Sequence, residues 1–123
     1  MAIQGLDHIN ISTAKLAETT AFFTEVLGLS VGWRPDFSFA GTWLYAGDKD
    51  LVHLVEVAEA PRPSKGSALD HFAFAIDDYE AAVEALDRLG VAYRPLPSPA
   101  AHIRQLFVTD LNGVTIELNC RAG

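Results

Sequence analysis

The chain has 123 residues, of which half are hydrophobic and a fifth are charged. This composition is typical of one globular domain and excludes disordered and low-complexity chains. Nine Lys and Arg residues against 16 Asp and Glu residues give a net charge of −7. An acidic chain without a basic cluster repels nucleic acid phosphates and anionic membrane surfaces, so we expect neither as a partner.

The sequence also carries signals about its compartment. No apolar run approaches the roughly 20 residues that a membrane span needs. The first residues lack the basic region and apolar stretch of a secretory signal. The single cysteine, Cys120, excludes an intrachain disulfide and is consistent with a reducing compartment. We therefore expect a cytoplasmic protein.

A short segment near the start of the chain recurs in the second half. Leu6–Ile9 (LDHI) returns as Leu69–Phe72 (LDHF), 63 residues later. Each copy is followed by apolar residues at helical spacing, and each predicted helix ends at a glycine, Gly28 or Gly90. Strand-like segments follow in both halves, at residues 29–33, 37–46 and 51–57, and then at 91–94, 103–109 and 114–120. Each half is therefore predicted to be β-α-β-β-β.

The repeat predicts an α+β fold in a single domain, residues 1–123. Two β-α-β-β-β modules, at about residues 5–57 and 68–120, are expected to pair and form a larger mixed sheet, with one face covered by helices and the other free to curve around a ligand. The Pro- and Ser-containing stretch 58–67 is the predicted linker between them. A second stretch, 95–101, has three prolines and is predicted to be a loop able to act as a lid, because proline suits neither a helix nor a central strand.

Four side chains that can bind metal occupy equivalent positions of the repeat. His8 and His71 lie on the first predicted strand of each half, while His53 and Glu117 lie on the last. Singly, each would be assigned a structural role, but a pseudo-twofold axis would bring all four toward one point. Imidazole and carboxylate together suit one divalent ion of Zn, Ni, Co, Mn or Fe. His102, after the proline-rich stretch, is expected at the surface or as a proton donor beside the site.

Aromatic and cationic residues give weaker indications about the substrate. Five aromatic residues crowd the middle strands of the first half, and the last four would share one face if no bulge intervenes: Trp33, Phe37, Phe39, Trp43 and Tyr45. Core packing is the expected role of most, and one or two at the site would favour an apolar or aromatic substrate. Three arginines are candidates for holding a substrate carboxylate, although exposed charge is the default interpretation: Arg34, Arg94 and Arg104.

Four segments carry a resemblance to a known family: residues 6–11, 22–29, 69–74 and 107–118. Over nearly its whole length the chain resembles the vicinal oxygen chelate superfamily of glyoxalases, bleomycin-resistance proteins and ring-cleaving dioxygenases. In glyoxalase-like members, the resemblance implies metal ligands at His8, His53, His71 and Glu117. In the dioxygenases, it implies iron held at His8, His71 and Glu117, with a catalytic histidine in the region of His53.

The resemblance implies a divalent-metal-dependent lyase or isomerase whose small substrate chelates the ion through vicinal oxygens, with an enediolate-type intermediate. Glu117 is the expected base and His53 the alternative. A second possibility is an Fe(II)-dependent extradiol dioxygenase, although Phe107 replaces the tyrosine of that group. A third is a non-catalytic drug-binding protein, against which the retained ligand residues count. A homodimer is implied, with each site built from one chain or from two.

Overall fold

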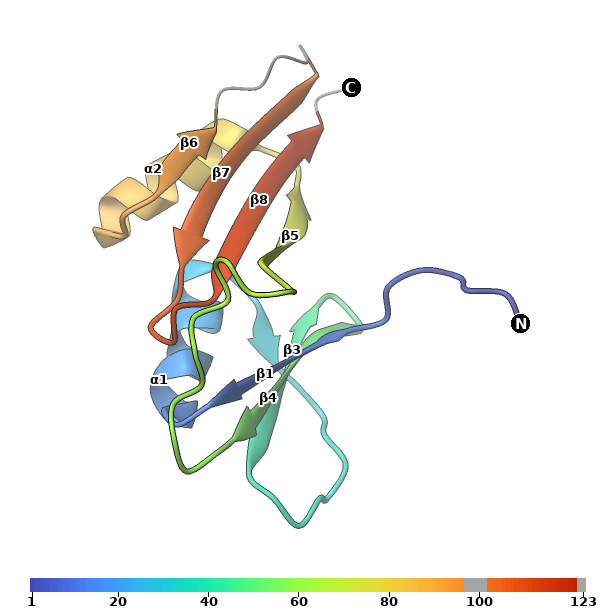
Figure 1. The fold of residues 1–123 in the computed structure, drawn as a ribbon. Coiled ribbons are helices and arrows are strands. Elements are labelled where there is room, and N and C mark those ends of the chain that lie inside the picture. Colours follow the sequence, from blue (N-terminus) through green and yellow to red (C-terminus); the bar gives the residue numbers. More distant parts are fainter. Residues whose placement is uncertain (97–101, 122–123) are drawn as a thin grey trace. The chain divides into compact units, whose positions relative to one another are not determined.

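The computed structural model describes residues 1–96 and 102–121 (Figure 1). The chain divides into two compact units, Met1–Pro61 and Arg62–Gly123. Among the described residues, no helix combines the length and apolarity needed to cross a membrane.

The first unit has the predicted β-α-β-β-β order. Its strands form one open sheet in the order β1-β4-β3-β2, in which β1 runs parallel to β4 and the other neighbours are antiparallel. The α-helix continues directly into a short π-helical segment, η1. The elements are β1 (Ile9–Thr13), α1 (Leu16–Ala21), η1 (Phe22–Val26), β2 (Ser30–Val31), β3 (Gly41–Ala46) and β4 (Lys49–Glu56).

The second unit repeats this arrangement. Its sheet has the order β5-β8-β7-β6, again with one parallel pair, β5 and β8, between a first and a last strand. The elements are β5 (His71–Ile76), α2 (Tyr79–Leu89), β6 (Arg94–Leu96), β7 (Ile103–Thr109) and β8 (Thr115–Arg121). The α+β class and the duplicated module predicted from the sequence are therefore confirmed (Figure 1).

In both units, buried apolar residues alternate along the last strand, and this alternation determines which of its side chains face the core. In β4, Val52 and Leu54 are fully buried, and in β8 the same is true of Ile116, with Leu118 5% exposed. Full burial of such a side chain contributes about 1.5–3 kcal/mol to folding. Because successive strand residues point to opposite faces, the residues between them are directed to the other side of each sheet. This alternation places His53 and Glu117 on the face opposite to these apolar side chains.

Glycines end both helical segments, as predicted. Gly90 follows α2 with φ 69°, and Gly28 follows η1 with φ 74°. A left-handed residue at this position lets the backbone turn away from the helix, and glycine adopts it without steric cost.

The proline-rich stretch differs in part from the prediction. Residues 95–101 were expected to be loop, but Pro95 and Leu96 belong to β6, and Pro95 pairs with Leu106. The prediction was wrong for these two residues because β6 is an edge strand, where a missing N–H need not interrupt the ladder. Of the strand predicted at 91–94, only Arg94 is in β6. Residues 97–101 lie outside the described part of the chain.

The aromatic stretch of the first unit is also less regular than predicted. Strand β3 begins at Gly41, so Phe37 and Phe39 precede it, and the register shifts between Leu44 and Tyr45. The condition for a single aromatic face, a strand without a bulge, is therefore not met. Nor do these rings fill the core, since Trp33 is 72%, Phe37 42% and Phe39 47% exposed.

Candidate functional site

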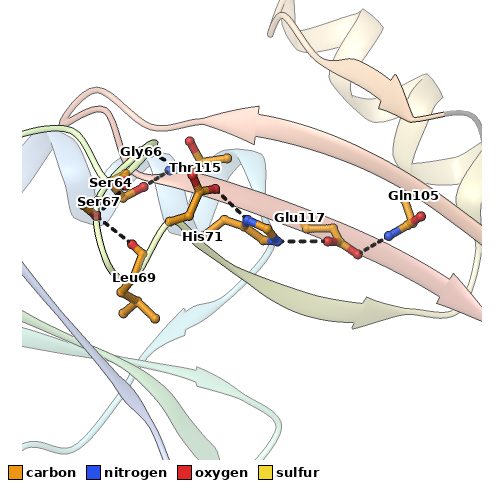
Figure 2. A network of polar contacts seen from close by, with 9 residues as sticks. Ser64, Gly66, Ser67, Leu69, His71, Gln105, Thr115 and Glu117 are labelled. Atoms are coloured by element: carbon orange, nitrogen blue, oxygen red, sulfur yellow. Dashed lines mark hydrogen bonds and ion pairs between the residues drawn. The ribbon is translucent and has the colours of Figure 1, made fainter.

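The second unit brings His71 and Glu117 together on one sheet face. Parallel pairing of β5 with β8 sets His71 opposite Thr115. Glu117 follows Thr115 by two residues on β8 and therefore lies on the same face of the sheet. The Nε2 atom of His71 lies 3.4 Å from Oε1 of Glu117 (Figure 2). Glu117 is only 6% exposed, whereas the His71 side chain is 39% exposed. The pair thus presents a buried carboxylate beneath an accessible imidazole.

Neighbouring groups occupy the remaining polar atoms of this pair. Nδ1 of His71 is 2.8 Å from Oδ2 of Asp70. Oε2 of Glu117 accepts hydrogen bonds from the Gln105 amide at 2.9 Å and the Asn119 amide at 2.8 Å. These contacts fix both side chains and leave Nε2 and Oε1 facing each other. Partners of this kind are what orient the ligands of metal sites.

The electrostatics favour the ionised form of both carboxyl groups. Burial would raise the pKa of Glu117, but hydrogen bonds from Gln105 and Asn119 and the charge of His71 outweigh it, so the pKa is lowered. The Gly66 backbone N–H and the His71 ring lower the pKa of Asp70. An ionised carboxylate only accepts hydrogen bonds, so Nδ1 of His71 is the donor to Asp70. In neutral His71, the lone pair is then on Nε2, the atom that faces Glu117.

A loop before β5 holds Asp70 in place. The backbone N–H of Gly66 donates to Oδ1 of Asp70 at 2.7 Å, and the Ser67 hydroxyl bonds the carbonyl oxygens of Ser64 and Leu69. The Ser64 hydroxyl in turn accepts from the backbone N–H of Thr115 at 2.8 Å, which ties the loop to β8 (Figure 2). The imidazole is therefore positioned by a chain of contacts that begins on the strand carrying Glu117.

The first unit repeats part of this arrangement. Nδ1 of His8 is 2.7 Å from Oδ2 of Asp7, the same contact that the repeated sequence makes at Asp70 and His71. His53 is different from its counterpart Glu117. Its ring stacks on His8, with centroids 3.8 Å apart, and on Trp43, with centroids 3.9 Å apart. Its Nε2 atom lies 2.7 Å from Oδ2 of Asp50.

Stacking has a consequence for metal binding. A histidine binds a metal along an in-plane lone pair at about 2.0–2.1 Å. The rings of His8 and His53 are inclined by only 16°, so their in-plane lone pairs run in nearly parallel planes. In this arrangement the two histidines do not converge on one ion. Among the described residues of the first unit, the hydrogen bond of His8 is made through Nδ1 to Asp7, while His53 is a stacked ring bound to Asp50.

The predicted site residues therefore form two pairs, His8 with His53 and His71 with Glu117. Within residues 1–96 and 102–121, no three His, Cys, Asp or Glu side chains gather as a group that could hold a metal ion. His71 and Glu117 bring an imidazole nitrogen and a carboxylate oxygen to 3.4 Å from each other. His102 is exposed, directly before β7.

Among the residues that contact these pairs, Asp50, Gln105 and Asn119 were not predicted as site residues, and Trp43 was predicted only as one of five aromatic residues that could reach the site. Asn119 could have been found two residues after Glu117, on the same strand face. Gln105 pairs with Asn119 across β7 and β8, which requires the strand register. The stacking of Trp43 on His53 follows from their register pairing between β3 and β4. No signal in the sequence singled out Asp50.

Known proteins share this architecture. A solved structure of a putative glyoxalase family protein from Bacillus anthracis has a TM-score of 0.82 at 20% identity, covering 98% of each chain. A mutant of the fosfomycin resistance protein FosX from Listeria monocytogenes, in complex with Mn(II) and 1S,2S-dihydroxypropylphosphonic acid, has a TM-score of 0.75 at 21% identity, covering 99% of this chain and 94% of that one. Both likenesses concern the fold.

Sequence comparison gives the family. The glutathione transferase FosA of Serratia marcescens is 28% identical, over 95% of this chain and 81% of that protein. The model of the Glyoxalase/Bleomycin resistance protein/Dioxygenase superfamily matches residues 5–118. The chain therefore belongs to the Glyoxalase/Bleomycin resistance protein/Dioxygenase superfamily.

Proposed function

We propose that this protein is a divalent-metal-dependent enzyme that acts on a small substrate by lyase or isomerase chemistry. The supporting observation is the pair in the second unit, where Nε2 of His71 faces Oε1 of Glu117 at 3.4 Å while neighbours hold their other polar atoms. A buried carboxylate oxygen and an imidazole nitrogen that face each other in this way suit two ligands of one ion.

In this proposal, His8 is the third ligand. Its hydrogen bond to Asp7 repeats the bond of His71 to Asp70, so both histidines present Nε2. His8 would come from the same chain or from a second copy in a homodimer. Zn, Ni, Co, Mn and Fe all accept this donor set, and the Mn(II) complex of FosX supports a divalent ion in this superfamily.

We assign His53 to proton transfer rather than to the metal. Its Nε2 atom is bound to Asp50, and its ring is stacked between His8 and Trp43. Asp50 fixes the tautomer, and a positioned imidazole is the commonest general acid or base in enzymes. Glu117, expected from the sequence to be the base, has one oxygen held by the amides of Gln105 and Asn119, which suits it as an oriented ligand. A bound ion would polarise the substrate oxygens that chelate it.

Metal analysis of protein purified without chelators or oxygen tests the ligand assignment. We expect about one ion per site, strongly reduced in Glu117→Gln and His71→Ala but retained in His53→Ala and in the exposed control Glu84→Gln. Turnover should be lost in the first three variants. If Glu117→Gln keeps its metal and loses turnover, Glu117 is the base instead. If no divalent ion binds even after reconstitution, His71 and Glu117 form only an ion pair and the enzyme proposal fails.

A substrate screen tests the reaction. It should include α-ketoaldehydes with a thiol, fosfomycin with glutathione or water, and catechols with oxygen uptake recorded. Product formation from an α-ketoaldehyde without oxygen consumption is expected. Addition of glutathione or water to fosfomycin would keep the metal-dependent enzyme but replace the lyase or isomerase assignment. Bound iron together with oxygen uptake on catechols would replace this proposal with ring cleavage.

A further inference from the structure

The sheet face that carries His71 and Glu117 extends into a cavity of about 340 Å³ within the second unit. Phe107 on β7 pairs with Glu117 on β8. Thr115 on β8 pairs with His71 on one side and with Thr109 on the other. All five side chains therefore lie on one face of the sheet. The residues that line this cavity include Lys65, Arg94, Phe107, Thr109 and Thr115. The cavity therefore adjoins the two proposed metal ligands.

The charges of this cavity contrast with those of the whole chain. The chain has a net charge of −7, yet the described lining includes Lys65 and Arg94 and no Asp or Glu. Within the described residues, neither cation forms an ion pair with a carboxylate. Asp70 lies close enough to Lys65 to feel its charge, but the Gly66 N–H and the His71 ring already bond this carboxylate.

One aromatic ring connects the cationic side of the cavity to the proposed metal ligands. The Arg94 guanidinium carbon is 4.8 Å from the centre of the Phe107 ring. The same ring meets His71 edge-on, with centroids 5.3 Å apart. Stacking on an aromatic face orients a guanidinium and leaves its N–H groups in the plane free to donate. A small ligand could thus contact Arg94 at one end and the region of His71 at the other.

We propose that this cavity binds an anionic group of the substrate, a carboxylate or a phosphonate, through Arg94 and Lys65. This inference rests on the proposed function, which places the remainder of the substrate at His71 and Glu117. A planar guanidinium fork and an ammonium group together match the oxygens of either anion. The hydroxyl of Thr109, which is exposed, supplies a further donor. Arg94 and Lys65 would then determine specificity rather than perform chemistry.

Titration of the ¹⁵N-labelled protein, followed by NMR, tests the site without requiring turnover. The probes are methylphosphonate, acetate and the neutral acetamide, at low and high salt. We expect saturable shifts of the amides of Lys65, Arg94, Thr109 and Thr115 with an anion but not with acetamide, and weaker binding at high salt. The anion that binds more tightly identifies the group. No saturable shift, or equal shifts with acetamide, would overturn the proposal.

Charge-removing variants locate the binding. The double variant Lys65→Gln/Arg94→Gln should weaken anion binding at least tenfold, since it removes both charge-assisted donors. Arg88→Gln, on α2 and outside this cavity, is the matched control and should bind normally. Unchanged affinity in the double variant would refute the assignment.

Metal content measured on the same samples separates the two proposals. Anion binding by a protein that takes up no metal supports the cavity and contradicts the enzyme proposal. Metal uptake without anion binding supports the enzyme proposal and contradicts the cavity proposal.

Discussion

The two units share one topology but surround equivalent positions with different chemistry. His53 on β4 lies between the ring faces of His8 and Trp43. Glu117, its counterpart on β8, accepts hydrogen bonds from the amides of Gln105 and Asn119. Ring faces pack against a planar imidazole, whereas amide donors stabilise a negative charge. A duplicated framework has thus been adapted to a stacked ring in one half and to an anion in the other.

The comparison also shows which features depend on the framework alone. The contact between an aspartate and the next histidine occurs in both units, at 2.7 Å for His8 and 2.8 Å for His71. It follows from the repeated Leu-Asp-His sequence at the start of each sheet. The environments of His53 and Glu117 instead depend on residues of the third and fourth strands, where the two sequences have diverged.

The largest expected effect concerns the cores. Phe23 and Leu86 are equivalent in the repeat, and they are 0% and 2% exposed. Phe23→Ala should lower the free energy of unfolding by about 3–5 kcal/mol and Leu86→Ala by about 2–5 kcal/mol, because each leaves a cavity. Urea denaturation measures both. Phe23→Leu serves as a milder control, and a loss below about 1 kcal/mol in Phe23→Ala would show that this position does not anchor the core.

The next effect distinguishes the two polar environments. Gln105→Met removes one of two amide donors to Glu117 and should weaken metal affinity about 10–100-fold, as is typical when a group that orients a ligand is lost. The corresponding change in the first unit, Asp50→Asn, should leave metal affinity within about twofold if His53 is not a ligand. Competition with a chelator of known affinity measures both. Equal losses would mean that His53 belongs to the metal site.

The order of elements and the pairing of the four candidate residues could be predicted because they follow from a repeat. Leu-Asp-His, a helical segment and three strands occur twice. In each sheet, the apolar alternation of the last strand directs His53 or Glu117 to the face opposite the buried apolar side chains. The stacking of His53 and the hydrogen bonds to Glu117 could not be predicted. They depend on cross-strand register, such as Trp43 opposite His53 and Gln105 opposite Asn119, which the local sequence does not specify.

The edge strand β6 and the π-helical segment η1 show the same limit. Proline is excluded from central strands but tolerated at an edge, and the position of a strand in a sheet is a tertiary property. The apolar spacing of residues 16–27 predicts a helix correctly. It does not distinguish α-helical from π-helical hydrogen bonding, because the π-helical segment is a single turn of five residues within the helical stretch.

A smaller effect is expected at the helix starts. The Asp78 side chain accepts a hydrogen bond from the backbone N–H of Ala81 at 3.0 Å and so caps α2. Lys15, at the same position before α1, provides no side-chain cap. Asp78→Ala should therefore cost about 1 kcal/mol of stability. Lys15→Ala should change stability by less than about 0.5 kcal/mol. Thermal unfolding of both variants measures these two changes in stability. An equal loss of stability in the two variants would show that the Asp78 cap of α2 contributes nothing specific.

The smallest effect is the pH dependence that Glu117 gives to the metal-free protein. Its pKa is lowered in the folded state from the ordinary 4.5, so the folded protein binds fewer protons than the unfolded chain near that pH. The resulting stabilisation is fully present above the ordinary pKa and is lost as pH falls through the lower folded value. The stability of the wild type should therefore decline more steeply below pH 4.5 than that of Glu117→Gln. Asp48→Asn, at an exposed turn, should keep the wild-type slope. Parallel slopes in the wild type and Glu117→Gln would mean that the two amide donors do not stabilise the carboxylate, and the contrast between the units would then rest on the stacked His53 alone.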